Sequence, residues 1–224
     1  MTNDGLVPAV NQSFVLRALE KALTLQAPLA RAHVARLRRK SPEASPQEIL
    51  RRLNAEFRTG TVSTGAGVGA AAAVPTVRKG VAISLAGGEF VTFLQASVLY
   101  VLARSEVYGM RTPDVERQRF LVTAVLLGES VSSAIPTVAE RTGKHWARAI
   151  IETIPRELIV RINKILGRNF VTKYGTKQGV IVLGKVVPFG IGALIGGAAN
   201  GILSHGIIRS SNRAFGPVPT SWGP

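Results

Sequence analysis

Small side chains recur every four residues near the end of the chain, in a series through Gly192, Gly196, Asn200 and Ser204. An α-helix brings residues four apart onto one face, so this spacing predicts a helix with a face of small side chains. Glycine inside a helix costs about 1 kcal/mol relative to alanine, so we expect this face to pack closely against another helix. A flexible glycine-rich loop is the alternative.

A second, shorter series of small residues lies upstream and includes Ala73. We expect the two segments to pack against each other, or against a second copy of the chain. The residues predicted to make these close helix contacts are Gly65, Gly69, Gly192, Gly196, Gly197, Gly201 and Asn200.

Both series lie in stretches without charged residues, 59–77 and 186–208. The second stretch holds 23 residues, and a helix of that length, at about 1.5 Å per residue, is long enough to cross a bilayer. Six of its residues are glycine, and Asn200, Ser204 and His205 are polar. We therefore favour a helix buried inside a soluble bundle, with insertion into a membrane as the alternative.

Helical signals continue through the rest of the chain, and the alternation typical of strands is absent. Ser45, Pro46 and Glu48 form a capping box, which predicts a helix that ends at Gly60. Apolar residues spaced by three and four predict another over 88–108, closed by a glycine cap. Further helices are expected to begin at Pro28 and at Thr112 and Pro113, to cover 137–153, to run from Pro155 to Gly167, and to cover 176–187 and 189–213.

These signals predict an all-α protein, a single multi-helix bundle with a glycine-rich central helical hairpin around Pro188. We expect the bundle to span residues 59–215. Residues 1–58 are expected to form a basic helical N-terminal extension that packs on or beside it. Residues 216–224 contain three prolines and two glycines, which predicts a flexible tail.

Positive charge is concentrated at the two ends of the chain. The formal net charge is +15, of which +5 belongs to residues 1–58, +1 to 59–135 and +9 to 136–224. Such a balance predicts a polyanionic partner, either anionic lipid headgroups or nucleic acid, whereas a solvated basic surface is the plainer interpretation. The candidate binding residues are Arg141, Lys144, Arg148, Arg161, Lys164, Arg168, Lys173 and Lys177.

An anionic membrane surface is the favoured partner, because the charges flank apolar, glycine-rich segments. Nucleic acid is disfavoured, because only 6% of the residues are aromatic and they are not interleaved with the basic residues as a base-stacking platform requires. A second copy of the chain or a membrane protein is a further candidate partner.

The residues needed for common catalytic chemistry are scarce. The chain has no cysteine, and its three histidines lie on separate segments without a glutamate at a ligand spacing. Gly143 and Lys144 are followed by His145, which does not match a phosphate-binding loop. We therefore expect no metal, no cofactor and no enzymatic activity. A polar cleft around Tyr108, Asp114, Glu116 and Asn200 is the enzymatic alternative.

The first residues, from Met1 to Pro8, lack the basic and apolar regions of a secretory signal. We expect the chain to start in the cytoplasm and to act at the inner face of the membrane.

Four stretches together resemble the EcsC family of bacterial helical proteins. They are the Gly/Ala run 65–73 closed by Pro75, the apolar helix that ends in Ser105-Glu106-Val107-Tyr108-Gly109 before Pro113 and Glu116, the basic stretch from Arg161 to Lys177, and Lys185-Val186-Val187-Pro188-Phe189-Gly190 leading to Asn200. The resemblance covers about residues 60–216. It implies a helical, non-enzymatic protein that acts near membranes.

The function predicted from the sequence is a membrane-associating helical protein. Its basic faces would engage anionic lipid, and its glycine-rich helices would pack together or insert. The alternative is a soluble scaffold or interaction protein whose small-residue faces serve core packing only.

Overall fold

The computed structural model describes residues 12–72, 79–128, 145–184 and 191–222, and describes side-chain surroundings at 14–64, 88–128, 145–172 and 197–222. Within these ranges the chain forms seven α-helices and no strands, which confirms the predicted all-α bundle.

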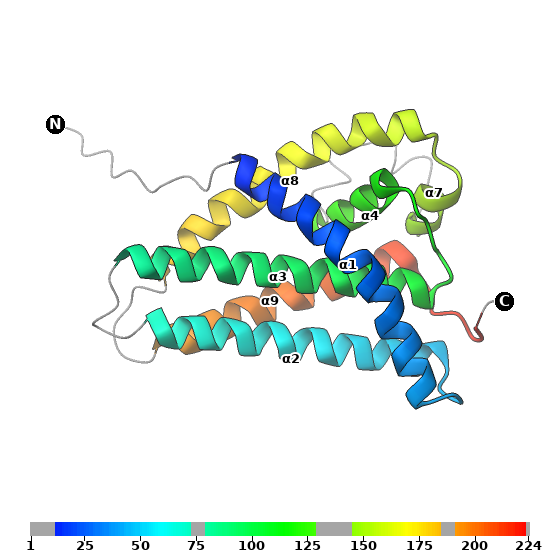
Figure 1. Ribbon diagram of the computed structural model, residues 1–224, viewed down its shortest axis with the longest axis horizontal. Helices are drawn as coiled ribbons and strands as arrows, with labels where there is room; N and C mark the ends of the chain where they lie inside the picture. Colours follow the sequence, from blue (N-terminus) through cyan, green and yellow to red (C-terminus); the bar gives the residue numbers. More distant parts are fainter. Residues whose placement is uncertain (1–11, 73–78, 129–144, 185–190, 223–224) are drawn as a thin grey trace.

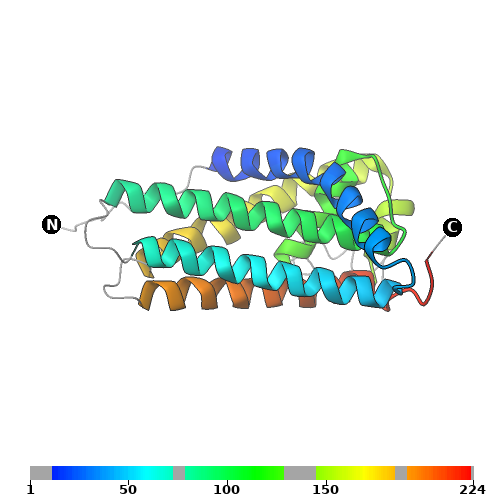
Figure 2. The same cartoon turned by 60° about the horizontal axis from the view of Figure 1, so that its bottom comes forward.

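Three long helices lie side by side along the length of the molecule: α2 (Pro46–Ala72), α3 (Lys79–Val107) and α9 (Ile191–Phe215) (Figures 1 and 2). α2 and α9 run in opposite directions and form the most extensive helix pair in the described part of the chain. Thus a helix near the start of the chain and the last helix are paired along their lengths.

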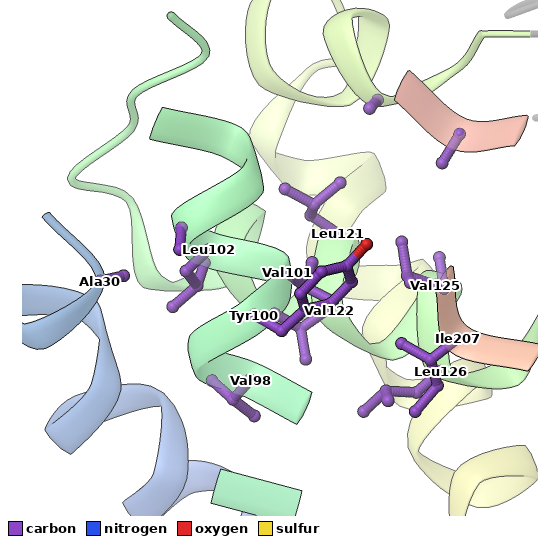
Figure 3. Close-up of a cluster of buried hydrophobic side chains, with 14 of the residues drawn as sticks. Ala30, Val98, Tyr100, Val101, Leu102, Leu121, Val122, Val125, Leu126 and Ile207 are labelled. Carbon is purple, nitrogen blue, oxygen red and sulfur yellow. The ribbon is translucent and has the colours of Figure 1, made fainter. Parts of the chain in front are cut away.

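α4 (Val115–Leu127) is the central helix of the bundle. Residues 120–127 are all buried, as expected of a helix with neighbours on every side. Figure 3 shows Leu121 and Val125 of α4 among side chains from α3 and α9. Val115, at the start of α4, lies outside this buried stretch and is 53% exposed.

α1 (Gln12–Lys40) continues through Pro28, so the prediction of a new helix at Pro28 is wrong. Proline removes one backbone donor and crowds the preceding turn, which kinks a helix without necessarily ending it. α1 changes direction midway (Figure 2). The buried side chains Leu23, Ala30 and Val34 lie on both sides of Pro28 in the same core, so packing holds the two halves in place.

α2 begins at the predicted capping box. The Ser45 backbone N–H donates to Glu48 Oε2 at 2.8 Å, and the Glu48 N–H donates to Ser45 Oγ at 3.3 Å. The predicted end at Gly60 is wrong, because α2 continues to Ala72. One glycine costs about 1 kcal/mol in a helix, which the contact between α2 and α9 outweighs.

The connection between α3 and α4 is capped at both ends. α3 ends before Gly109, whose φ of 67° is a left-handed conformation that favours glycine. The Met110 N–H donates to the Ser105 carbonyl at 2.9 Å, which closes the helix end as predicted. At the start of α4, Asp114 is the cap and accepts a hydrogen bond from the Glu116 N–H at 2.9 Å.

α8 (Arg156–Gly184) passes through Gly167, where the sequence predicted an end, so that prediction is also wrong. Gly167 packs close to α1, since a Cβ added there would lie 3.5 Å from Leu16 Cδ2. The described part of the basic segment 137–153 forms the short helix α7 (Ala147–Glu152). The predicted hairpin turn around Pro188 lies outside the described residues.

The structure shows no boundary between residues 58 and 59, where the sequence placed the end of an extension. α2 crosses this position without interruption. One hydrophobic core contains residues from both sides of this position, Leu19 and Leu53 before it and Phe93 and Leu121 after it. The described residues of 1–58 are therefore part of the bundle.

The described part of the C-terminal tail, residues 216–222, has no regular secondary structure but is held on the bundle, contrary to the predicted flexible tail. The Trp222 indole N–H donates to the Ala44 carbonyl at 2.9 Å, and the Arg38 guanidinium lies 4.1 Å from the centre of the indole ring. Gly216, with φ of 76°, ends α9 and accepts a hydrogen bond from the Tyr108 hydroxyl at 2.9 Å.

Candidate functional site

The outer face of α8 carries three exposed cations, Arg161, Lys164 and Arg168. No carboxylate of the described residues lies within 4.0 Å of their charged nitrogens. Ile165, which is 43% exposed, lies among them in the sequence. We call these four residues the α8 basic face. It combines unpaired positive charge with an exposed apolar side chain.

The other predicted basic residues are placed differently. Arg148 on α7 is exposed but forms an ion pair with Glu152 at 2.6 Å. Arg141 and Lys144 lie outside the described residues. Lys173 and Lys177 belong to α8, but their side chains lie outside the described surroundings. Because Arg148 is paired with a carboxylate and lies on a different helix, it is not part of the α8 basic face.

A pocket of about 480 Å³ lies beside the α8 basic face and is lined by residues of α1, α4 and α8. Figure 1 shows where these three helices lie in the bundle. Its apolar lining includes Leu16 and Leu19 of α1 and Val160 and Val171 of α8. We call it the α8 pocket. Its polar lining residues are Glu20, Glu116, Arg119, Thr123, Asn163, Lys164, Arg168 and Thr172.

Two polar side chains of the α8 pocket are almost fully buried and incompletely hydrogen-bonded. Thr123 is 1% exposed and Asn163 is 6% exposed. The Asn163 amide nitrogen donates to the Glu116 carbonyl at 2.9 Å and to Glu116 Oε2 at 2.6 Å. In contrast, Asn163 Oδ1 and Thr123 Oγ1 have no hydrogen-bond partner among the described residues. Buried polar atoms without partners are uncommon, so the side chains of Thr123 and Asn163 are candidates for ligand contact. We call these two side chains the buried wall of the pocket.

The two carboxylates of the pocket are already engaged. Arg119 lies 3.0 Å from Glu20 Oε1 and 3.4 Å from Glu116 Oε1. Lys164 and Arg168 remain without a carboxylate partner among the described residues. The net charge of the lining is therefore positive on the α8 side.

The sequence analysis did not find the α8 pocket, because its residues come from three helices that are distant in the chain. Neither Thr123 nor Asn163 was among its candidate binding residues. No spacing rule within one helix brings Leu16, Thr123 and Lys164 together, so the available signal was the basic series on α8 alone.

A second polar group is buried around Arg104, which is 1% exposed. Its guanidinium donates to the Tyr100 hydroxyl at 2.9 Å and to the Tyr108 hydroxyl at 3.2 Å, while its Nε has no partner within the described ranges. Burial raises the pKa of Tyr100 above its usual 10.0, although the Arg104 charge opposes this. The spacing of four between Tyr100, Arg104 and Tyr108 in an apolar helix was a signal for this cluster that the sequence analysis did not use.

The helices that carry the two small-residue series pack against each other. Asn200 is buried and donates to the Thr61 carbonyl at 3.0 Å and to Glu89 Oε1 at 3.1 Å. A Cβ added to Gly201 would lie 3.5 Å from Val62 Cγ2. Gly197 is also buried. The surroundings of the other small residues in these series lie outside the described side chains: Gly65, Gly69, Gly192 and Gly196.

The side chains of the four residues of the enzymatic alternative bond to different partners. Tyr108 bonds to Gly216, and Asn200 bonds to Thr61 and Glu89. Asp114 caps α4 and Glu116 bonds to Asn163. Among the described residues, no three acidic or histidine side chains are grouped to hold a metal ion.

One helical segment of the described residues, Gly88–Val107 in α3, is long and apolar enough to cross a membrane. Its mean hydropathy is 1.2, and 67% of it is buried inside the protein. A core helix of a soluble bundle has the same properties. This segment is not the window 186–208 that the sequence analysis considered.

No family model matches the chain, and neither does any curated protein or solved structure.

Proposed function

We propose that the protein binds the surface of anionic membranes through the α8 basic face. The observation that carries this proposal is the group of exposed cations Arg161, Lys164 and Arg168, which have no carboxylate partner in the described part of the chain. Cations already paired within the protein gain less from a lipid phosphate than unpaired ones. The exposed Ile165 adds apolar area that the interfacial region of a bilayer accommodates.

The charge of this face sets the strength of binding. Each basic residue close to an anionic leaflet contributes about 1 kcal/mol, so three contribute about 3 kcal/mol at low salt. This corresponds to roughly two orders of magnitude in the membrane partition coefficient. The attraction is screened within about 8 Å at physiological ionic strength, so binding should weaken steeply as salt is added. The inner face of a membrane is the expected location, as the resemblance to the EcsC family also suggests.

The experiment is flotation with vesicles that contain phosphatidylglycerol or only phosphatidylcholine, across a salt series. The test variant is Arg161→Gln/Lys164→Gln/Arg168→Gln. The matched control, Arg39→Gln/Lys40→Gln/Arg58→Gln, removes the same charge from exposed residues on α1 and α2. We expect the test variant to lose about a hundredfold in partition coefficient and the control to lose much less. Equal losses in both, or binding that ignores salt, would refute a specific role for α8.

A soluble scaffold or interaction protein is the second candidate. The observation that favours it is the burial of Asn200 and Gly197 between helices of the same chain, which gives the small-residue face a partner within the bundle. On this alternative the protein stays soluble and monodisperse, and shows no preference between the two vesicle types.

A further inference from the structure

We infer that the α8 pocket binds one amphiphile with a hydrocarbon chain and an anionic head that carries hydroxyl groups. This goes beyond docking on a membrane surface, because it requires a single molecule to enter between α1, α4 and α8. The inference is based on the size of the pocket, its unpaired buried polar atoms and the placement of its charges.

The size and lining of the pocket suit a small amphiphile. A volume of about 480 Å³ lies within the range of small-molecule sites. Leu16, Leu19, Val160 and Val171 provide apolar contacts from two helices. A hydrocarbon chain placed against them leaves water, which is the main favourable term for binding such a ligand.

The lining residues Thr123 and Asn163 carry unpartnered polar atoms, which favours a ligand with a hydrogen-bonding group. Asn163 Oδ1 is an acceptor without a donor in the described part of the chain, and its orientation is fixed because the amide nitrogen bonds twice to Glu116. Thr123 Oγ1 can both donate and accept. A ligand hydroxyl that reaches Asn163 Oδ1 donates to it, and one that reaches Thr123 Oγ1 can donate to it or accept from it. A simple hydrocarbon or a fatty acid carboxylate does not donate to Asn163 Oδ1.

The sign of the head group follows from the cations beside the pocket. Arg119 is paired with both Glu20 and Glu116 and offsets one of their two negative charges. With Lys164 and Arg168 included, the charged side chains of the lining carry a net positive charge. Lys164 and Arg168 remain available to a phosphate or a similar anion. A zwitterionic head adds a positive charge near these cations, so it should bind more weakly.

The probe is a short-chain lysophosphatidylglycerol, which has one acyl chain, one phosphate and several hydroxyls. Its binding to the full-length protein is measured by titration calorimetry below the concentration at which it forms micelles. Glycerol phosphate tests the head without the chain, and lysophosphatidylcholine of the same chain length tests a zwitterionic head. We expect one molecule bound per chain, with both comparison ligands binding at least tenfold more weakly.

Thr123→Val tests the buried wall while keeping the shape of the side chain. Because Thr123 Oγ1 bonds to none of the residues that the structure describes, this variant should keep or raise the melting temperature. We expect it to bind the lysolipid about five- to tenfold more weakly. The matched control is Ser211→Ala, which removes a buried hydroxyl of α9 that does not line the pocket, and it should bind as the wild type does.

The outcomes separate this inference from the proposed membrane docking. Arg161 belongs to the α8 basic face but does not line the pocket, so Arg161→Gln should weaken vesicle flotation and leave lysolipid binding unchanged. Equal binding by Thr123→Val and wild type, equal binding of glycerol phosphate, or no saturable binding at all would each overturn the pocket inference. None of these results bears on flotation, which is measured independently.

Discussion

The contact of the C-terminal tail with the bundle is a sharp test of the structure, because the composition of the tail predicts that it is free. Trp222 connects the tail to the end of α1 and to the connection before α2. Its indole N–H bonds to the Ala44 carbonyl, and its ring lies 4.1 Å from the Arg38 guanidinium carbon. The side chain is partly buried against the core. We expect Trp222→Ala to destabilise the whole bundle.

The magnitude follows from these three contacts. The hydrogen bond contributes about 1 kcal/mol to the free energy of unfolding. A cation–π contact at an exposed site contributes about 0.5–1 kcal/mol. The half-covered indole adds about 1 kcal/mol of apolar burial. The total is about 2–3 kcal/mol, which for a chain of this size lowers the melting temperature by roughly 5–10 °C.

The assay is urea and thermal unfolding followed by circular dichroism, so that the loss of a fluorophore does not affect the signal. Trp222→Phe keeps the aromatic ring but removes the donor, and should cost about 1 kcal/mol. A double-mutant cycle of Trp222→Ala with Arg38→Gln isolates the cation–π contact. If Trp222→Ala unfolds within about 0.5 kcal/mol of the wild type, the tail is not held as the structure shows.

Two further predictions concern the helices. Gly60 and Gly206 lie inside α2 and α9, and a Cβ added to either meets no atom within 4 Å. Gly60→Ala and Gly206→Ala should each raise the free energy of unfolding by about 0.5–1 kcal/mol in urea titrations, and a decrease would show that the glycines have a packing role. Tyr100 has a folded-state pKa above 10.0, raised chiefly by burial. The folded state therefore holds the phenol proton more tightly, and stability should be complete below pH 10 and fall as the pH rises further. Tyr100→Phe should lessen this alkaline loss in melting curves, and an unchanged profile would exclude Tyr100 as its source.

The local signals of the sequence determined the helix caps. Each cap acts through a hydrogen bond to a residue within five positions, so its pattern could be recognised without knowledge of the fold. The caps are the pair Ser45 and Glu48, the residue Asp114, and the turn at Gly109. The same is true of the all-α class, which follows from apolar spacing along each segment. The basic series on α8 could also be predicted, because helical spacing alone places its members on one face.

Only the tertiary structure decided where the helices continue. Pro28, Gly60 and Gly167 all lie inside helices, although each residue type favours an end. Their local costs are about 1 kcal/mol for glycine and about 3 kcal/mol for proline. The free energy gained by packing α1 on α3, α2 on α9 and α8 on α4 exceeds those costs. A residue pattern within one segment does not reveal this packing.

The candidate binding site depended on tertiary structure for the same reason. The sequence determined that Lys164 and Arg168 share a helix face, but Leu16 and Thr123 reach them only because α1 and α4 pack on α8. The tail was likewise placed by a contact between Trp222 and Ala44, far apart in the chain. Local hydrogen bonds are encoded within a few residues, whereas pockets and docked segments arise from the packing of distant surfaces.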